Sequence, residues 1–218
     1  MLNKSIDAVI FDMDGLLIDT EAVYLEAYQA AAALMGVELP LAFCHSLIGR
    51  PSPDCDRLIQ DYFGPAFALE AFNDHADGHA ARTLEANVPV KPGAAELLAF
   101  LGEHGLPLGV ATSSSRRTTE RHLGQAGLLG HFRVLATRDD VRRGKPHPDL
   151  YLEAARRLSV APRRCLALED SNNGLTAAHA AGMLAVMVPD IVPPTDEVRA
   201  KCLAVLPDLR AAIALLKG

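Results

Sequence analysis

Short apolar runs recur along the chain and alternate with segments whose apolar residues have helical spacing. The runs that fit buried strands lie at 6–11, 106–112, 134–137, 165–169 and 184–188. Helical patterns lie between most of them, for example over 94–104, 117–126, 148–158 and 174–181. Continuous apolar strands that alternate with helices are typical of a parallel sheet covered on both faces. The pattern therefore predicts a doubly wound α/β domain, in which ligands bind beyond the carboxyl ends of the strands.

One long stretch interrupts this alternation. Between residues 21 and 87 no convincing strand appears, and residues that favour helices dominate segments such as EAVYLEAYQAAAALMG. The segment VPVKPG at 88–93 supplies two prolines and a glycine where the α/β pattern resumes. We expect a core domain formed by residues 1–17 and 88–218, and an inserted helical cap domain formed by residues 18–87. A helical module on two linkers beside the carboxyl edge of the sheet could act as a lid.

Composition and charge exclude several classes of protein. The 218 residues include 27 acidic residues and 21 Lys or Arg, a net charge of -6, and 50% of them are hydrophobic. The chain can bury an ordinary core, and without a long basic run it is not expected to bind nucleic acid. The N-terminal segment lacks a secretory apolar run, and polar residues break the uncharged stretch 171–189. We therefore expect a cytoplasmic protein with no membrane partner. The four cysteines form no CxxC pair, which favours reduced thiols.

Carboxylates follow two of the predicted strands. Asp12 and Asp14 end the first strand in FDMDG, and Glu169 and Asp170 end the run CLALED. If the two strands are central neighbours, these side chains meet in one small volume. Carboxylates that lie so close together raise one another's pKa unless a cation neutralises them. Carboxylate oxygens are hard ligands, which suit Mg2+. Such acids can also simply cap the following helices. Acidic residues at two strand ends favour the metal site.

Two further segments carry groups suited to an anion. The run VATSSS ends a strand and opens a helix, so the Thr112 hydroxyl and the amides of Ser113 and Ser114 can face a negative charge. Lys145 lies in the stiff turn GKP, from which its ammonium could reach the same volume. A solvated surface lysine is the alternative interpretation of this residue.

Taken together, the segments FDMDGLLIDTE, ATSS, GKPHPD and LEDSNNG resemble the haloacid dehalogenase-like superfamily of aspartate-nucleophile phosphotransferases. They occur in the family's order and spacing and span nearly the whole chain. The tail NNGLTAAHAAGMLAVMVPD is also similar to a subgroup that contains β-phosphoglucomutase-like, pseudouridine-phosphatase-like and small sugar-phosphatase proteins. The branch that removes halide needs neither a metal nor a second acid, so Asp14 and Asp170 argue against it.

The resemblance implies a role for each matching residue. Asp12 would be the nucleophile that forms an aspartyl phosphate, and Asp14 would act as general acid and then as general base. Thr112, the amide of Ser113 and Lys145 would hold the phosphoryl oxygens.

The same resemblance implies a magnesium site in a Rossmann-like core. The Asp12 carboxylate, the Asp14 main-chain carbonyl and Asp170 would hold Mg2+. Glu169 would be either a further ligand or a residue next to the ligands.

Selectivity is expected to come from the inserted cap, in particular from the loop SLIGRPSPD. Thr20, Gly49 and Arg50 are the predicted substrate-binding residues outside the core motifs. In the mutase, the matching cap loop carries an arginine that holds the second phosphate of a sugar bisphosphate. Here that position aligns with Ser52, and Tyr24 stands where the mutase usually has a histidine.

These departures make a phosphatase for a small phosphorylated sugar, polyol or related metabolite the leading hypothesis. A β-phosphoglucomutase-type isomerase is the alternative, and a catalytically silent binding protein is the third possibility. We expect a monomer or a weak homodimer.

Overall fold

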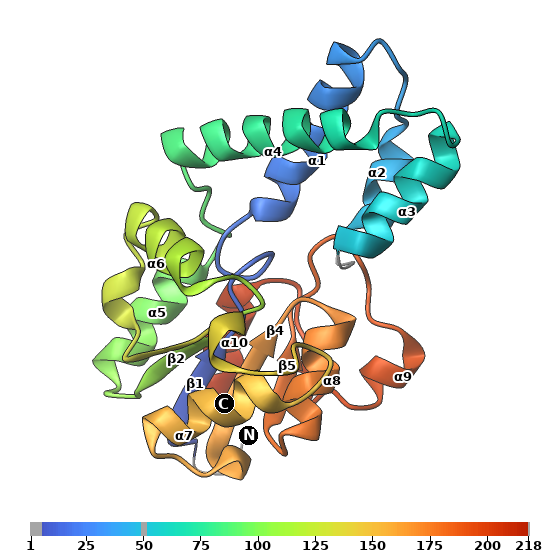
Figure 1. Cartoon of the computed structure of the whole chain (residues 1–218). Helices are drawn as coiled ribbons and strands as arrows, with labels where there is room; N and C mark the ends of the chain where they lie inside the picture. The colour runs from blue at the N-terminus through green and yellow to red at the C-terminus, as the bar shows by residue number, and fades with distance from the viewer. Residues whose placement is uncertain (1–5, 49–51, 218) are drawn as a thin grey trace. The chain divides into compact units, whose positions relative to one another are not determined.

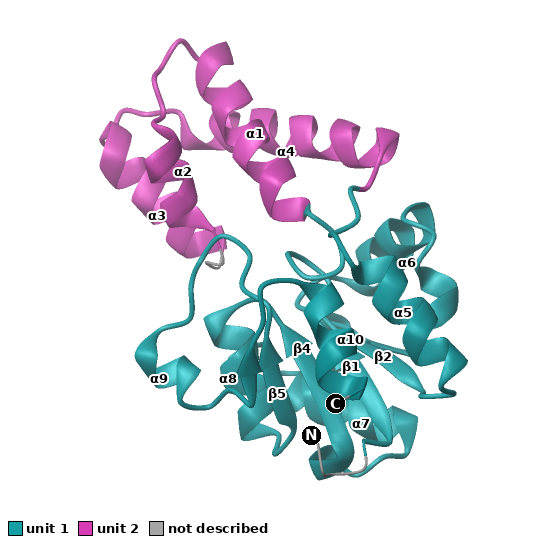
Figure 2. Ribbon diagram, turned by 180° about the vertical axis from the view of Figure 1, so that it is seen from behind, with its two compact units in different colours: residues 1–19, 89–218 teal, residues 20–88 magenta. Residues whose placement is uncertain are grey.

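The computed structural model describes residues 6–48 and 52–217. The chain divides into two compact units, one formed by Met1–Asp19 and Pro89–Gly218 and the other by Thr20–Val88 (Figure 2). The larger unit contains the strands and the smaller unit is helical.

The larger unit contains a parallel sheet. In the described part of the chain its strands are β1 (Ala8–Phe11), β2 (Leu108–Ala111), β3 (Val134–Ala136), β4 (Cys165–Glu169), β5 (Leu184–Met187) and β6 (Ala204–Val205). They lie in the order β3-β2-β1-β4-β5-β6, and every neighbouring pair is parallel. The predicted doubly wound α/β fold is confirmed.

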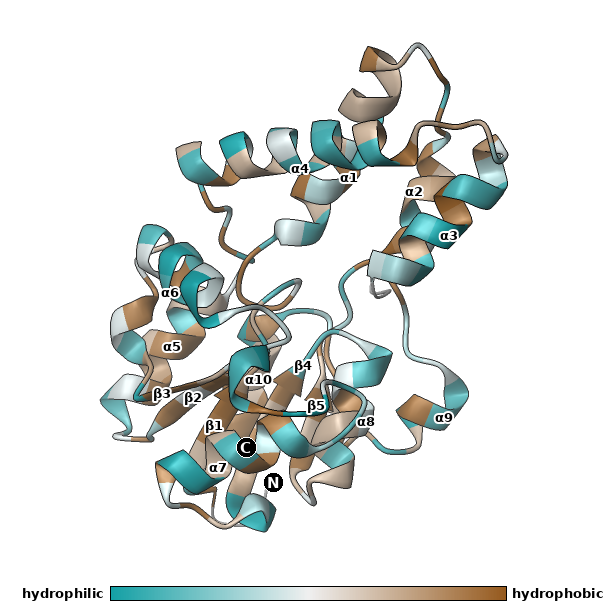
Figure 3. Ribbon diagram, viewed as in Figure 1, coloured by the Kyte–Doolittle hydropathy of each residue, from teal (hydrophilic) through white to brown (hydrophobic). Residues whose placement is uncertain are grey.

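The central strands form because their sequences are apolar at every position or nearly so. All residues of β1, AVIF, and nearly all of β4, CLALE, are hydrophobic, and both strands are buried throughout. The strands accordingly lie among the most hydrophobic segments of the molecule (Figure 3). A strand buried on both faces shows no alternation, so a continuous apolar run predicts it. No prediction covers β6, because a strand of two residues is too short to show a pattern.

Helices cover both faces of the sheet. In chain order they are α5 (Ala94–Glu103), α6 (Arg116–Gln125), α7 (Asp149–Leu158), α8 (Asn172–Ala180), α9 (Asp196–Arg199) and α10 (Leu209–Lys217). Short 3-10 turns η1 (Leu129–His131), η2 (Arg138–Asp140) and η3 (Pro162–Arg164) complete the connections. Helices α7 and α8 lie over the face seen in Figure 1, and α10 lies over the opposite face seen in Figure 2. The core under α7 and α8 includes Ile10, Tyr151 and Ala167.

The register of the two central strands decides where the strand ends meet. Phe11 of β1 pairs with Leu168 of β4, and the Asp12 amide donates to the Leu168 carbonyl at 3.0 Å. Asp12 and Glu169 therefore lie side by side at the carboxyl ends of β1 and β4. β1 lies between β2 and β4, so the connections that follow β1 and β4 lead to opposite sides of β1 in the sheet. This reversal of strand order is a topological switch point, where α/β sheets bind ligands.

The smaller unit consists of α1 (Thr20–Leu34), α2 (Leu41–Leu47), α3 (Ser52–Phe63) and α4 (Leu69–Ala86). Small buried residues, among them Ala27 and Ala31 on α1 and Ala76 and Ala80 on α4, let these two helices pack closely. No helix in the part of the chain that the structure describes has the length and hydropathy needed to span a bilayer.

Candidate active site

Asp12, Lys145 and Glu169 form a buried charge cluster at the carboxyl ends of β1 and β4. The Lys145 ammonium donates to Asp12 Oδ1 at 2.6 Å and to Glu169 Oε1 at 2.5 Å. Asp12 is 6% exposed and Glu169 is fully buried. The turn between η2 and α7 thus brings Lys145 to the strand ends, so it is not a solvated surface lysine.

Burial and charge act in opposite directions within this cluster. Burial raises the pKa of Asp12 to about 7, although the nearby Lys145 ammonium acts to lower it. Burial lowers the pKa of Lys145, but the charges and hydrogen bonds of Asp12 and Glu169 outweigh this effect and raise the pKa overall. Lys145 is therefore a permanent cation, whereas the Asp12 carboxylate is not fully compensated.

Asp170 adds a third buried carboxylate. Oxygen atoms of Asp12, Glu169 and Asp170 all lie within 4.8 Å of one another. Three carboxylates share this volume with the single ammonium of Lys145, so the donor set fits a hard divalent cation, which prefers oxygen ligands. Asp12 follows β1, and Glu169 and Asp170 lie at the end of the neighbouring strand β4, so all three are candidate ligands for such an ion.

Asp14 lies three residues beyond the end of β1 and is held by the loop after β2. Its Oδ2 accepts a hydrogen bond from Ser114 Oγ at 2.7 Å and a longer one from Thr112 Oγ1 at 3.4 Å. The buried Thr112 hydroxyl in turn accepts from the Ser114 amide at 3.0 Å, while Ser113 is exposed. The hydroxyl of Ser114 was not predicted as a site group, although its place two residues after Thr112 in the run TSSS is a signal that could have found it.

The Glu169 carboxylate accepts hydrogen bonds on both oxygens. Besides Lys145, Oε1 accepts from the Tyr151 hydroxyl at 2.9 Å. Oε2 accepts from the amides of Asp170 and Ser171 and from Ser171 Oγ, each at 3.0 Å. Ser171 also caps α8, because its Oγ accepts from the Gly174 amide at 3.0 Å. Sequence reasoning missed Tyr151, since it lies on the apolar face of α7 and gives no sign of a polar partner.

The remaining predicted residues belong to the inserted segment 20–88. Thr20 is buried and begins α1 in the helical unit. Gly49 and Arg50 lie outside the described residues.

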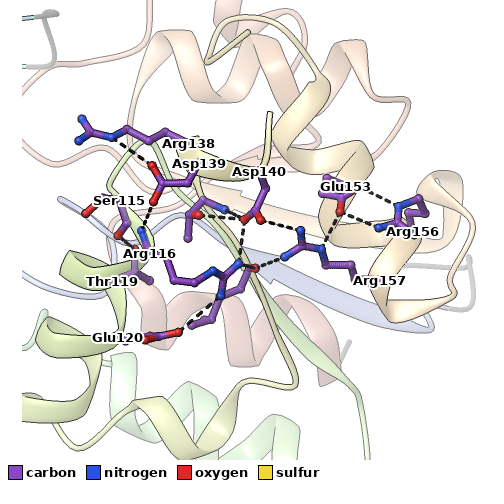
Figure 4. A network of polar contacts seen from close by, with 12 residues as sticks. Ser115, Arg116, Thr119, Glu120, Arg138, Asp139, Asp140, Glu153, Arg156 and Arg157 are labelled. Carbon is purple, nitrogen blue, oxygen red and sulfur yellow. Dashed lines mark hydrogen bonds and ion pairs between the residues drawn. The ribbon is translucent and has the colours of Figure 1, made fainter. Parts of the chain in front are cut away.

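A second polar network, which we call the Asp140 network, connects η2 with α6 and α7 (Figure 4). Asp140 Oδ2 accepts from the Thr137 amide and hydroxyl and from Arg116, and Oδ1 accepts from Arg157 at 2.7 Å. Arg157 also donates to Glu153 at 2.6 Å. Burial raises the pKa of Asp140, but the bonds from Arg157 and Thr137 outweigh it and hold the pKa well below its usual range. This network joins α6 and α7, and none of its bonds described above involves Asp12.

The fold and the site together indicate a class of hydrolase. In this class the switch point of a doubly wound sheet carries an aspartate, a lysine and two further carboxylates. The model of the haloacid dehalogenase-like hydrolase family matches residues 6–182. The chain belongs to this family, and the predicted resemblance is confirmed.

Individual relatives agree with this assignment. The Bacillus subtilis protein YhcW is 38% identical over 195 residues, which cover 87% of this chain and 86% of YhcW. Hexitol phosphatase B of Escherichia coli is 34% identical over 192 residues, which cover 85% of each chain. The crystal structure of a family hydrolase from Deinococcus radiodurans with bound phosphate and sodium superposes with a TM-score of 0.81 at 28% identity, covering 99% of this chain and 98% of that one.

Proposed function

We propose that this protein is a Mg2+-dependent phosphatase that hydrolyses a small phosphorylated sugar, polyol or related metabolite through an aspartyl phosphate on Asp12. The observation that carries the proposal is the position of Asp12 at the switch point of the sheet, 2.6 Å from the Lys145 ammonium and beside the buried Asp170. The phosphatase activity named for the Escherichia coli relative supports the substrate class.

In the first step a carboxylate oxygen of Asp12 attacks phosphorus, and the bond from phosphorus to the ester oxygen breaks. Asp14 gives its proton to the departing alkoxide, so the alcohol leaves neutral. Asp14 is suited to this role because hydroxyl groups of Ser114 and Thr112 hold its carboxyl group in place. Water then attacks the phosphorus of the aspartyl phosphate and gives a proton to Asp14, while the bond from phosphorus to the Asp12 oxygen breaks. Inorganic phosphate leaves, and both residues are restored.

Charge neutralisation is the main requirement of this chemistry. Phosphoryl transfer passes through a loose transition state in most analyses, so alignment and electrostatics supply most of the catalysis. Lys145 supplies one positive charge at the oxygens of the phosphoryl group, and the Thr112 hydroxyl and the Ser113 amide are the predicted donors to those oxygens. A bound Mg2+, held by Asp12, the Asp14 carbonyl and Asp170, would neutralise the remaining negative charge.

Residues of the helical unit are proposed to select the substrate. This unit is inserted at Asp19, a few residues after Asp12 and Asp14, so its chain connections start from the loop that carries the nucleophile. Thr20 at the start of α1, together with Gly49 and Arg50, remains the proposed substrate-binding set. Ser52 and Tyr24 replace the arginine and histidine that the mutase uses, which supports transfer to water.

The test is release of phosphate from an aryl phosphate and from a panel of sugar, polyol, nucleotide and glycolate phosphates. The wild-type protein with Mg2+ is expected to release phosphate, and Asp12→Asn is expected to lose at least about 10³-fold in kcat. Acid quenching with radiolabelled substrate should trap the aspartyl phosphate in the wild type only. Full activity of Asp12→Asn would refute the nucleophile.

Two other outcomes identify the competing functions. Conversion of β-glucose 1-phosphate to glucose 6-phosphate without free phosphate, given a catalytic bisphosphate, would identify the isomerase. Absence of turnover on the entire panel would favour the silent binding protein.

A further inference from the structure

Tyr151 contacts both charged partners of the Lys145–Glu169 pair and is itself fully buried. Its hydroxyl donates to Glu169 Oε1 at 2.9 Å, and its ring face lies 5.4 Å from the Lys145 ammonium. A cation within about 6 Å of an aromatic centroid is attracted to the ring. Tyr151 is fully buried in the first turn of α7, so its ring cannot swing away. One side chain thus fixes the distance between the ammonium and the carboxylate.

The Glu169 carboxylate has no lone pair to spare. An ionised carboxylate offers about four acceptor sites. Here five donors approach it: Lys145 and Tyr151 at Oε1, and the Asp170 amide, the Ser171 amide and the Ser171 hydroxyl at Oε2. A cation that took Glu169 as a ligand would have to displace at least one of these donors.

Gly174 provides the space in which this carboxylate lies. A Cβ atom built on Gly174 would overlap both the Oε1 atom and the carboxyl carbon of Glu169. Gly174 is in the first turn of α8, where its helical backbone does not itself require glycine. Since glycine in a helix is less stable than alanine by roughly 1 kcal/mol, the packing of Glu169 is the reason for a glycine here.

We propose that Tyr151 and Gly174 are positioning residues that hold the Glu169 carboxylate beneath the start of α8, where it orients Lys145 toward Asp12 and does not ligate the divalent cation. Asp12 and Asp170 then remain the carboxylates that hold the ion. This inference rests on the proposed function, because Lys145 matters as the group that binds the phosphoryl oxygens.

The experiment combines Tyr151→Phe, Gly174→Ala and Glu169→Asp with two binding measurements made without turnover. Mn2+ binding is measured by electron paramagnetic resonance of the free ion, and inorganic phosphate binding is measured by calorimetry in the presence of Mg2+. Asp170→Asn serves as the variant that loses a metal ligand. Gly102→Ala, at a helical glycine with no atom within 4 Å of the added Cβ, controls for the glycine substitution.

Phosphate binding should weaken while Mn2+ binding persists. Gly174→Ala is expected to weaken phosphate binding about tenfold and Tyr151→Phe about fivefold, because both displace the partner of Lys145. Mn2+ affinity should stay within about threefold of the wild type in both variants, whereas Asp170→Asn should lose at least about tenfold. Gly102→Ala should change neither.

A double variant separates positioning from a general loss of structure. Aspartate at position 169 withdraws the carboxylate by about one carbon–carbon bond length, roughly 1.5 Å, and leaves room for a Cβ at 174. Gly174→Ala should therefore lower kcat/KM about twentyfold with Glu169 present and less than about threefold in the Glu169→Asp background. Equal losses in both backgrounds would contradict the packing argument.

Two results would overturn the inference. If Mn2+ affinity falls in Gly174→Ala or Glu169→Asp as far as in Asp170→Asn, Glu169 is a metal ligand. If Tyr151→Phe and Gly174→Ala both bind phosphate like the wild type, neither residue positions Lys145. Should Gly174→Ala fail to fold, Tyr151→Phe and Glu169→Asp decide the question. Both binding measurements are valid even if no tested ester is hydrolysed, so failure of the proposed function is distinguishable.

Discussion

The Asp140 network and the cluster around Asp12 both pair carboxylates of low exposure with cations, yet only the cluster around Asp12 carries an excess of negative charge. In the Asp140 network, Arg116, Arg156 and Arg157 surround the carboxylates of Asp140 and Glu153 (Figure 4). In the described part of the Asp12 cluster, one ammonium faces three carboxylates.

The pKa values of the carboxyl groups in the two regions are shifted in opposite directions. Bonds from arginine and threonine hold the pKa of Asp140 below its usual range, and bonds from Arg156 and Arg157 lower the pKa of Glu153 to about 2. Burial raises the pKa of Asp12 to about 7 despite its bond to Lys145. A network of paired charges stabilises the fold, whereas an excess of buried negative charge is useful only where a cation will neutralise it.

Removal of divalent metal should therefore affect the two regions very differently. Chelation with EDTA is expected to lower kcat by about 10³-fold, because the excess charge around Asp12 is then uncompensated. Added Mg2+ should restore the rate, and Ca2+ should inhibit, since its longer and more variable bonds misalign the attack. Steady-state assays measure this. A rate with Ca2+ equal to that with Mg2+ would contradict the geometric argument.

The second prediction concerns the Asp140 network. Asp140→Asn is expected to lower the free energy of unfolding by about 3 kcal/mol at pH 7, because it removes the charged acceptor that Arg116 and Arg157 share. Its kcat should change little, since the network does not touch Asp12. Urea unfolding measures the effect, and Asp139→Asn, at a neighbouring and more exposed carboxylate, is the matched control with a smaller expected loss.

The pH dependence of this loss follows from the lowered pKa of Asp140. A carboxyl group whose pKa is depressed in the folded state stabilises the fold above its unfolded pKa, and the contribution disappears as the pH falls below it. The difference between the wild type and Asp140→Asn should thus be complete near neutral pH and shrink below about pH 4. A difference that grows on acidification would show that Asp140 is not held as an ionised acceptor.

The third prediction concerns Asp12, whose substitution should raise the free energy of unfolding, whereas substitution of Asp140 should lower it. In metal-free protein the folded state binds more protons at Asp12 than the unfolded state between about pH 4 and pH 7, so stability from this group falls as the pH rises through that window. At pH 8 in EDTA, Asp12→Asn should be more stable than the wild type by on the order of 2 kcal/mol, while being inactive. Urea unfolding of both proteins from pH 4 to pH 8 tests this. Equal stability at every pH would mean that the charge of Asp12 is already compensated.

The smallest effect is expected at an exposed pair. Arg210 donates to Glu96 at 3.1 Å, but both side chains are more than half exposed. Such pairs contribute little because water and salt screen them. Glu96→Gln should leave the urea midpoint unchanged within error. A shift as large as that of Asp140→Asn would show that exposure does not separate the two kinds of ion pair.

Much of the fold follows from local pattern. Runs such as AVIF and CLALE are apolar at every position or nearly so, which predicts buried parallel strands, and Asp12, Asp14 and Asp170 stand where those strands end. The helical character of residues 20–88 also follows from composition, because Ala, Leu and Glu favour helices wherever they pack. Short elements such as β6 and α9 give no such signal and depend on the sheet already in place.

The sequence alone determined the alternation of strands and helices and the chemistry available at the strand ends, because side-chain periodicity and residue type are local properties. Only the tertiary structure decided that β1 and β4 are neighbours in register, that Lys145 reaches Asp12, and that Tyr151 and Gly174 enclose Glu169. These contacts join residues far apart in the chain, and their energies depend on burial and distance. Neither quantity is defined until the chain has folded.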